Sequence, residues 1–420
     1  MTENRTLVVG TTPDYVDWLR RKNPSRLLFL SERRLREQAL ECPPDPGEEL
    51  LCELAQPEGC RDQLRRHLEN LRLTLDGVVC YDCEALPLAA RLAKDFGLPF
   101  ASPEAVRLCR DKHLSKSAWR QSQVSCPESR RLTSETAAAE LLTKEKQAWV
   151  FKPACGGGSE FVYLVKTRAT AKTVFRKITK ALKQAENQLL FCDSQNLPAA
   201  VIAEEFIDGR EFSVDFRLEE NRVEILRLTE KIARPGDHFG TIRGYGLNPA
   251  GLSTEFEERL KTDLLAATKA LLLHRALGMA DFILKEGRAI FLEITPRPGG
   301  DCLPALLQAA GPFDILEEAL NFARAETAAP KRPPLRRLAA LRFHAETGGL
   351  IRHLDSQTLL RDRRVLACRL SRAVGDRVTM PPQDYDSWLL GHLIFMPRAN
   401  EDLARQCHEL HALLKVEIEP

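Results

Sequence analysis

The chain has 420 residues, of which 44% are hydrophobic and 29% charged, the make-up of an ordinary globular protein. Its 61 basic and 59 acidic residues leave a formal net charge of +2, so no overall charge draws it to nucleic acid or to an acidic membrane. No run of about 18 apolar residues is present, which argues against a membrane-spanning helix. The length predicts roughly three domains.

Neither the N-terminus nor the cysteines indicate secretion. A basic leader followed by an apolar stretch is missing, so we expect no secretion signal and a cytoplasmic location. Among the 12 cysteines, Cys80 and Cys83 form a lone CxxC, with no second pair at zinc-site spacing. We therefore expect free thiols in a reducing compartment.

Short apolar runs alternate with helical patterns over residues 1–110. The apolar runs cover residues 6–10, 27–30 and 78–80, and the helical patterns cover about 13–21, 59–72 and 84–95. This alternation predicts an α/β, Rossmann-like domain with a parallel sheet. The turn at Gly10 lacks the GxGxxG fingerprint, so we expect a structural role for it rather than a cofactor site.

The middle of the chain mixes strands, helices and a glycine-rich loop. Helices are predicted over 111–123, 170–187 and 254–277, and strands on both sides of a glycine loop within 147–166 and over 200–206, 211–217 and 223–228. Residues 235–251 read as a long loop, a feature that is often functional. Prolines make 326–334 a predicted linker, and a small α+β unit with strands at 338–343 and 391–396 follows.

The stretch from Asp281 to Gly300 carries the strongest chemical signal. It predicts two strands joined by a turn at Glu286-Gly287, which would bring Asp281 close to the segment from Glu293 to Thr295. Arg297 lies just beyond. Two carboxylates and a hydroxyl suit Mg²⁺, which proteins usually hold with one or two carboxylates plus substrate phosphates. This hairpin therefore suggests an enzyme that handles a nucleotide triphosphate.

Two further segments could contact a nucleotide. Gly156, Gly157 and Gly158, followed by Ser159, would let backbone N–H groups approach phosphate oxygens, with Lys152 supplying a charge. Because the lysine precedes the glycines and a strand follows, the segment is not a GxxxxGK[ST] loop and is closer to a flexible hairpin lid. Strand-end carboxylates in the second segment could accept hydrogen bonds from adenine or ribose; its residues are Glu204, Glu205, Phe206, Ile207 and Glu211. Taken alone, the glycine segment could be a plain turn, and the acidic segment could be a charged hairpin.

Taken together, these pieces resemble the ATP-grasp superfamily in order and spacing over about residues 100–310. Residues 335–420 are similar to the small C-terminal domain of its L-amino-acid ligases. The matching positions are Lys112, Lys152, Glu204 through Ile207 with Glu211, Asp281, Glu293, Thr295 and Arg297. Thr295 stands where the family has asparagine; a threonine hydroxyl can bind Mg²⁺ but reaches less far.

The resemblance implies an ATP-grasp fold and four segments. These are an N-terminal Rossmann-like domain (1–110), a lid subdomain (111–200), a central metal-binding domain (201–330) and a small C-terminal α+β domain (335–420). It also implies an ATP-dependent carboxylate–amine ligase that acts on amino acids, forms an amide or peptide bond through an acyl phosphate, and releases ADP and phosphate.

The same resemblance assigns roles to the residues. Lys112 and Lys152 would hold phosphates, the glycines would close as a lid, and Arg297 would stabilise the transferred group. Asp281, Glu293 and Thr295 would bind two Mg²⁺ ions, for which Mn²⁺ could substitute. We expect Glu293, Arg297 and Lys152 to be the catalytic set.

The sequence indicates the substrate contacts and partners less closely than it indicates the nucleotide site. His238, Arg243 and Tyr245 in the glycine-bearing loop, and Gly300 and Asp301 after Arg297, are the substrate candidates. A structural role for each of the loop residues is about as plausible. We expect small-molecule carboxylate and amine substrates and a possible homodimer. Two alternatives stay open: a bicarbonate-activating carboxylase, and a non-catalytic ATP-binding regulatory protein whose metal site decayed at Thr295.

Overall fold

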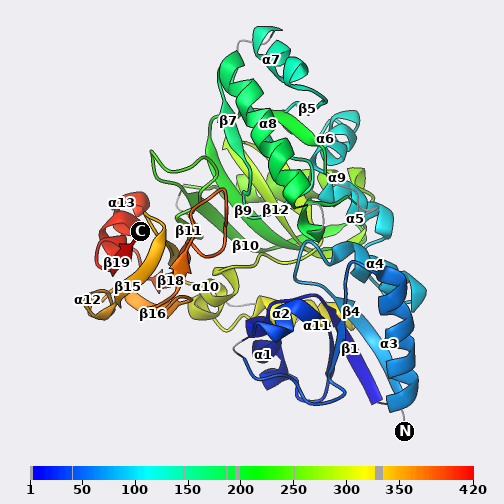
Figure 1. Ribbon diagram of the computed structural model, residues 1–420. Helices are drawn as coiled ribbons and strands as arrows, with labels where there is room; N and C mark the ends of the chain where they lie inside the picture. The colour runs from blue at the N-terminus through cyan, green and yellow to red at the C-terminus, as the bar shows by residue number, and fades with distance from the viewer. Residues whose placement is uncertain are drawn as a thin grey trace.

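The structure is a computed structural model that describes residues 3–39, 41–144, 147–185, 188–193, 199–249, 251–326 and 334–420. In Figure 1 the N-terminal sheet lies at the bottom, a lid of sheet and helices at the top, and the C-terminal strands at the left of a central sheet. The described strands form four sheets.

The N-terminal sheet is parallel, with strand order β3-β2-β1-β4. Helices cover both faces, so neighbouring residues of β1 enter different cores: Leu7 and Val9 join one hydrophobic cluster and Val8 another. The predicted Rossmann-like α/β domain is therefore confirmed, although β3 and α2 were not foreseen. The elements are β1 (Glu3–Val9), α1 (Pro13–Lys22), β2 (Leu27–Glu32), α2 (Arg33–Glu37), β3 (Glu49–Cys52), α3 (Pro57–Leu71), β4 (Leu73–Val79) and α4 (Leu86–Asp95).

The lid is an antiparallel sheet of order β5-β8-β6-β7. The predicted strand, glycine loop and strand are confirmed as β6, the loop and β7. The predicted helix 170–187 is α8, and residues 186–187 lie outside the described residues. The elements are α5 (Pro103–Arg110), α6 (Lys112–Gln121), β5 (Ser129–Leu132), α7 (Glu135–Lys144), β6 (Trp149–Pro153), β7 (Tyr163–Val165), α8 (Arg168–Gln184), the short 3₁₀ helix η1 (Leu189–Phe191) and β8 (Val201–Glu205).

The central sheet has eight strands in the order β13-β12-β9-β10-β11-β14-β18-β16. The C-terminal strands join it where β11 pairs with β14, so the predicted C-terminal strands continue this sheet. The elements are β9 (Arg210–Glu219), β10 (Arg222–Ile232), β11 (Gly244–Leu247), α9 (Thr254–Ala270), β12 (Arg275–Lys285), β13 (Arg288–Thr295), α10 (Leu303–Ala310), α11 (Ile315–Ala323), β14 (Ala339–His344), β16 (Val365–Leu370) and β18 (Leu389–Phe395).

A three-stranded sheet of order β17-β15-β19 completes the C-terminal region. Phe343 and Leu393 from the central sheet pack with Ile351 from this one in a single hydrophobic cluster. The C-terminal region is therefore α+β, as expected. The remaining elements are β15 (Gly349–Asp355), α12 (Gln357–Leu360), β17 (Arg377–Val378), α13 (Leu403–His411) and β19 (Lys415–Glu419).

Three sequence expectations change. The loop at 235–251 contains a strand, β11, because Gly244 lets the backbone approach Ala340: a Cβ there would lie 2.4 Å from the Ala340 carbonyl oxygen. The helix predicted over 254–277 ends at Ala270, since Leu272 takes a left-handed conformation (φ 56°) and β12 starts at Arg275. Of the predicted linker 326–334, residues 327–333, with Pro330 and Pro333, lie outside the described residues.

Two further observations bear on the sequence expectations. All twelve cysteines are free thiols, as predicted. Among the residues that the structure describes, no helix is long and apolar enough to cross a membrane.

Candidate active site

The predicted hairpin forms as expected from β12 and β13. Its two-residue turn uses Glu286 (φ 51°) and Gly287 (φ 73°), the paired positive φ angles that match the twist of a tight hairpin. The register pairs Asp281 with Glu293 and Met279 with Thr295. The two carboxylates therefore lie side by side on neighbouring strands, with the Thr295 hydroxyl next to them.

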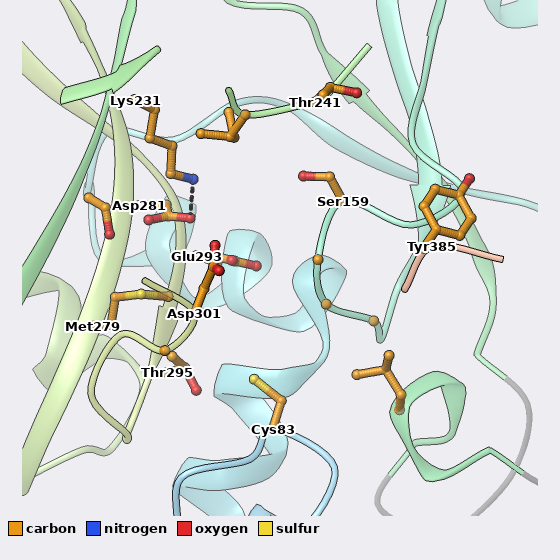
Figure 2. A pocket seen from close by; sticks show the side chains of 18 of the residues that line it. Cys83, Ser159, Lys231, Thr241, Met279, Asp281, Glu293, Thr295, Asp301 and Tyr385 are labelled. Atoms are coloured by element: carbon orange, nitrogen blue, oxygen red, sulfur yellow. Dashed lines mark hydrogen bonds and ion pairs between the residues drawn. The ribbon is translucent and has the colours of Figure 1, made fainter. Parts of the chain in front are cut away.

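These side chains line a cavity of about 260 Å³ at the junction of the lid, the central sheet and the C-terminal strands. Figure 2 shows Asp281, Glu293 and Thr295 on one wall, with Ser159 and Tyr385 on the opposite side. Of the residues predicted from the sequence, the cavity brings together Lys112, Gly156, Gly157, Gly158, Ser159, His238, Tyr245, Asp281, Glu293, Thr295, Arg297, Gly300 and Asp301.

Lys231 of β10 is the main site residue that the sequence did not reveal. Its Nζ lies 2.6 Å from Asp281 Oδ2, an ion pair drawn in Figure 2, and 2.7 Å from Glu211 Oε1. Burial opposes its charge, but Asp281 and Glu211 raise the pKa of Lys231 well above its ordinary value. Only strand alternation could have directed attention to Lys231, and alternation cannot distinguish a site lysine from a solvated one.

Lys112, at the start of α6, connects the hairpin to the lid. Its Nζ lies 3.2 Å from Glu293 Oε2 and donates to the Gly156 carbonyl at 3.0 Å. Burial alone would raise the pKa of Glu293, but the nearby charges, above all Lys112 and Lys231, hold it at about 2. Glu293 is therefore a carboxylate at any physiological pH.

The donor set fits a divalent cation. Asp281 is 6% exposed, and its Oδ1 has no hydrogen-bond partner among the described residues. Burial raises the pKa of Asp281, with Lys231 opposing the shift. A buried carboxylate oxygen without a partner is costly unless a ligand occupies it, and oxygen donors suit Mg²⁺. No group of three or more His, Cys, Asp or Glu side chains gathers for a metal within the described ranges, so substrate oxygens would have to complete the shell.

The segment predicted to hold adenine and ribose lies outside the cavity in this structure. Glu204 is 2% exposed and forms ion pairs with Lys152 Nζ at 2.6 Å and Lys116 Nζ at 3.0 Å. Burial lowers the pKa of Lys116 to about 8. Lys152 and the residues from Glu204 to Ile207 are absent from the cavity lining, and Glu211 contacts Lys231 instead. Their nucleotide-binding roles stay predictions.

Arg297 lies in the cavity wall with Gly300 and Asp301. Its Nε contacts Cys83 Sγ at 3.0 Å, and its Nη1 donates to the Pro298 carbonyl at 2.8 Å. Burial opposes its charge, but Cys83 and the nearby acids raise the pKa of Arg297. The guanidinium is therefore a fixed cation beside the two carboxylates.

The loop candidates separate into two groups. His238 and Tyr245 line the cavity, and the His238 ring lies edge-on against Tyr163 with centroids 5.5 Å apart. Arg243 is buried and turned away from the lining residues toward Asp237, which it meets at 2.7 and 2.8 Å. Its role as a substrate contact is a prediction that this geometry does not favour.

The arrangement defines a class of α/β protein. Its site combines fixed lysine and arginine cations with paired carboxylates beneath a glycine loop. Such a site is suited to binding a polyphosphate together with a divalent cation. Residues 109–301 match a family model described as an ATP-grasp domain. This stretch of the chain is accordingly an ATP-grasp domain, as the sequence resemblance predicted.

Comparison with individual proteins agrees with this fold. The structure of L-amino acid ligase from Bacillus licheniformis covers 100% of this chain and 99% of its own, with a TM-score of 0.77 at 19% identity. A biotin carboxylase structure from Campylobacter jejuni covers 100% and 92%, with a TM-score of 0.65 at 16% identity. The D-alanine–D-alanine ligase of Laribacter hongkongensis is 26% identical over 215 residues, 50% of this chain and 63% of that protein. The chain spans between 35% and 63% of the length of the curated relatives it matches.

Proposed function

We propose that the protein is an ATP-dependent carboxylate–amine ligase acting on amino-acid substrates. The observation that carries the proposal is the convergence of Lys112, Lys231, Asp281, Glu293 and Arg297 on one cavity beneath the glycine loop. Phosphoryl transfer needs positioning and charge neutralisation more than a protein nucleophile, and these residues supply both.

A second cavity of about 740 Å³ favours a reaction with two organic substrates. It lies between the N-terminal sheet and the C-terminal strands, and it shares Cys83, Arg297, Gly300 and Asp301 with the first cavity. One substrate could therefore be activated on the lysine side of Arg297 while another approaches from the opposite side. The L-amino acid ligase and D-alanine–D-alanine ligase likenesses support the same reaction class.

The proposed reaction has two steps. A carboxylate oxygen of the first substrate attacks the γ-phosphorus of ATP, and ADP leaves. The amine of the second substrate then attacks the acyl carbon, and inorganic phosphate leaves with the oxygen that came from the carboxylate.

The chain's own groups would position the reactants. Lys112 and Lys231 would hold the phosphate oxygens, and Arg297 would face the charge on the acyl phosphate. Closure of the loop at Gly156–Gly158 would exclude water from the acyl phosphate. Asp281, Glu293 and Thr295 would hold two Mg²⁺ ions, which when bound neutralise charge on the phosphates.

An isotope experiment tests this proposal directly. ADP release is screened with pairs of amino acids, and active pairs are repeated with the acid ¹⁸O-labelled in its carboxylate. We expect one ¹⁸O per released phosphate and a condensed amide in the mass spectrum. Label-free phosphate with an active pair would contradict acyl-phosphate formation, and ADP release that requires bicarbonate instead of an amine would favour a carboxylase.

A further inference from the structure

The end of the first cavity that faces the C-terminal strands has no role in the reaction described above. It is built from three parts of the fold that are far apart in sequence: β11, β14 and the segment between β17 and β18. The residues from these parts are Tyr245, Arg342, His344, Pro381, Tyr385 and Trp388. We call this end of the cavity the aromatic subsite.

His344 is a buried polar group without a partner at this place. The residue is 2% exposed and lines the cavity, and its Nδ1 has no hydrogen-bond partner among the described residues. The ring packs against Trp388, with centroids 4.4 Å apart. A buried nitrogen that makes no hydrogen bond is unfavourable, so a ligand group that reached His344 would relieve this cost.

The aromatic subsite connects to the reaction centre through an ion pair. Arg342 stands two residues before His344 on β14, and its Nε lies 2.8 Å from Asp301 Oδ2. Asp301 lines both cavities together with Arg297. A substrate activated beside Arg297 would therefore extend its side chain past Arg342 toward His344 and Trp388.

The charges around His344 restrict what can bind. Burial, together with Arg342 and Arg243, lowers the pKa of His344 to about 2, so the ring is neutral. The two guanidinium groups repel a cationic side chain, and Asp301 and Asp237 already pair with them, so their charge is balanced and gives an added carboxylate little attraction. A neutral planar group could hydrogen-bond to His344 and stack on Trp388.

We infer that the aromatic subsite binds an uncharged, planar, hydrogen-bonding side chain, such as a carboxamide, on the carboxylate substrate. The inference rests on the proposed function, because it names which amino acids that site accepts. It assigns to His344 a direct contact with substrate and to Trp388 the wall against which the planar group stacks.

Binding measurements test the inference separately from catalysis. Calorimetry is carried out with glutamine, methionine, glutamate and lysine in the presence of a non-hydrolysable ATP analogue and Mg²⁺. Methionine matches glutamine in length but cannot form the hydrogen bond. We expect glutamine to bind at least about tenfold more tightly than each of the other three, because the site would otherwise leave its polar group unpaired.

Two variants identify the residue responsible. His344→Phe keeps a ring against Trp388 but has no nitrogen, so we expect the preference for glutamine over methionine to disappear. His344→Asn returns a hydrogen-bonding group near the Nδ1 position and should restore part of it. Thermal unfolding confirms that both variants fold.

Each result has a defined meaning. Equal binding of glutamine and methionine by the unaltered protein, tighter binding of glutamate or lysine, no binding of any of the four, or an unchanged preference in His344→Phe would each overturn the inference. A glutamine preference without any ADP release would keep the subsite and reject the ligase activity instead.

Discussion

At the scale of single residues, the site depends on cations that hold carboxylates ionised inside the protein. Glu293 stays ionised despite burial because Lys112 and Lys231 lie close to it. Asp281 has one oxygen on Lys231, and its other oxygen has no hydrogen-bond partner in the part of the chain that the structure describes. Glu293 is paired with lysine alone, whereas Asp281 also offers a free oxygen to a cation. The next two predictions address this set of charges.

We expect Glu293→Gln to abolish turnover while the fold survives. The substitution removes a carboxylate from the proposed cation site and leaves Lys112 without its acidic partner. ADP release should fall by at least about 10²-fold, in the range seen when a charge-stabilising group is lost. Glu286→Gln, in the exposed turn of the same hairpin, is the matched control. Near-normal ADP production in Glu293→Gln would reject the metal assignment.

We expect Lys152→Ala to weaken ATP binding. Lys152 Nζ lies 2.6 Å from the buried Glu204, so in the predicted role it would turn from Glu204 to a phosphate of ATP. Its loss would remove that phosphate partner and leave Glu204 held by Lys116 alone. Calorimetry should show a dissociation constant raised by roughly 10- to 100-fold, the value of a charged hydrogen bond. Lys166→Ala, on an exposed part of the lid, should leave it unchanged. Unaltered affinity in Lys152→Ala would remove Lys152 from the nucleotide site.

At the scale of elements, contacts from distant segments fix the two loops around the cavity. Gly299 N donates to Asp215 Oδ1 at 2.9 Å, and Arg227 meets the other oxygen of Asp215 at 2.6 Å. This buried network holds the backbone beside Arg297. On the opposite side, the Tyr385 hydroxyl accepts the Phe161 N–H at 3.0 Å, and the two rings lie 5.3 Å apart. The C-terminal region thus holds the lid loop closed over the cavity.

We expect Tyr385→Phe to loosen the lid loop without unfolding the protein. The ring contact with Phe161 remains, but the hydroxyl that accepts the Phe161 N–H is lost. Water should then reach the acyl phosphate more often. The ratio of ADP released to amide formed should rise above that of the unaltered protein. An unchanged ratio, with unchanged melting temperature, would show that the hydroxyl does not restrain the lid.

At the scale of the whole molecule, the second cavity brings together acidic groups from different regions. Asp82 and Glu84 follow β4, and Glu160 belongs to the lid loop. Burial and the charge of Glu84 raise the pKa of Asp82 to about 7. Burial, followed by Asp384 and Glu84, raises the pKa of Glu160 to about 7 as well. Burial, followed by repulsion between acids at this junction, therefore makes global stability depend on pH.

The raised pKa of Asp82 decides whether the free energy of unfolding rises or falls with pH. Because its pKa is higher in the folded protein than in the unfolded chain, where it is about 3.9, the folded state binds more protons between about pH 4 and pH 7. The free energy of unfolding therefore falls as pH rises through this window. We expect Asp82→Asn to be more stable than the unaltered protein at pH 8, by on the order of 1 kcal/mol.

Urea unfolding at pH 4 and pH 8 measures this effect. The difference between Asp82→Asn and the unaltered protein should nearly vanish toward pH 4, where Asp82 is protonated when folded and about half protonated when unfolded. Asp95→Asn, at the exposed end of α4, should show no such gain between the two pH values. A stability difference that stays the same at both would contradict the raised pKa.

The sequence by itself determined the local structure and the hairpin chemistry. Alternating apolar runs predicted the parallel N-terminal sheet, and the spacing about Glu286-Gly287 predicted that Asp281 lies close to the segment from Glu293 to Thr295. Those features depend on backbone propensity and on neighbours along the chain. Local patterns gave less guidance where a turn or a close backbone approach intervened, as at Leu272 and Gly244.

Only the tertiary structure decided which distant side chains share the site. Lys231 meets Asp281 across 50 positions, and Arg342 meets Asp301 across a comparable separation. Glu204 faces two lysines rather than the cavity because β6, β8 and α6 bring them together. Such contacts follow from sheet order and packing, which residue spacing does not encode. The hairpin's carboxylates could therefore be predicted from the sequence, but their cationic partner Lys231 and the aromatic subsite could not.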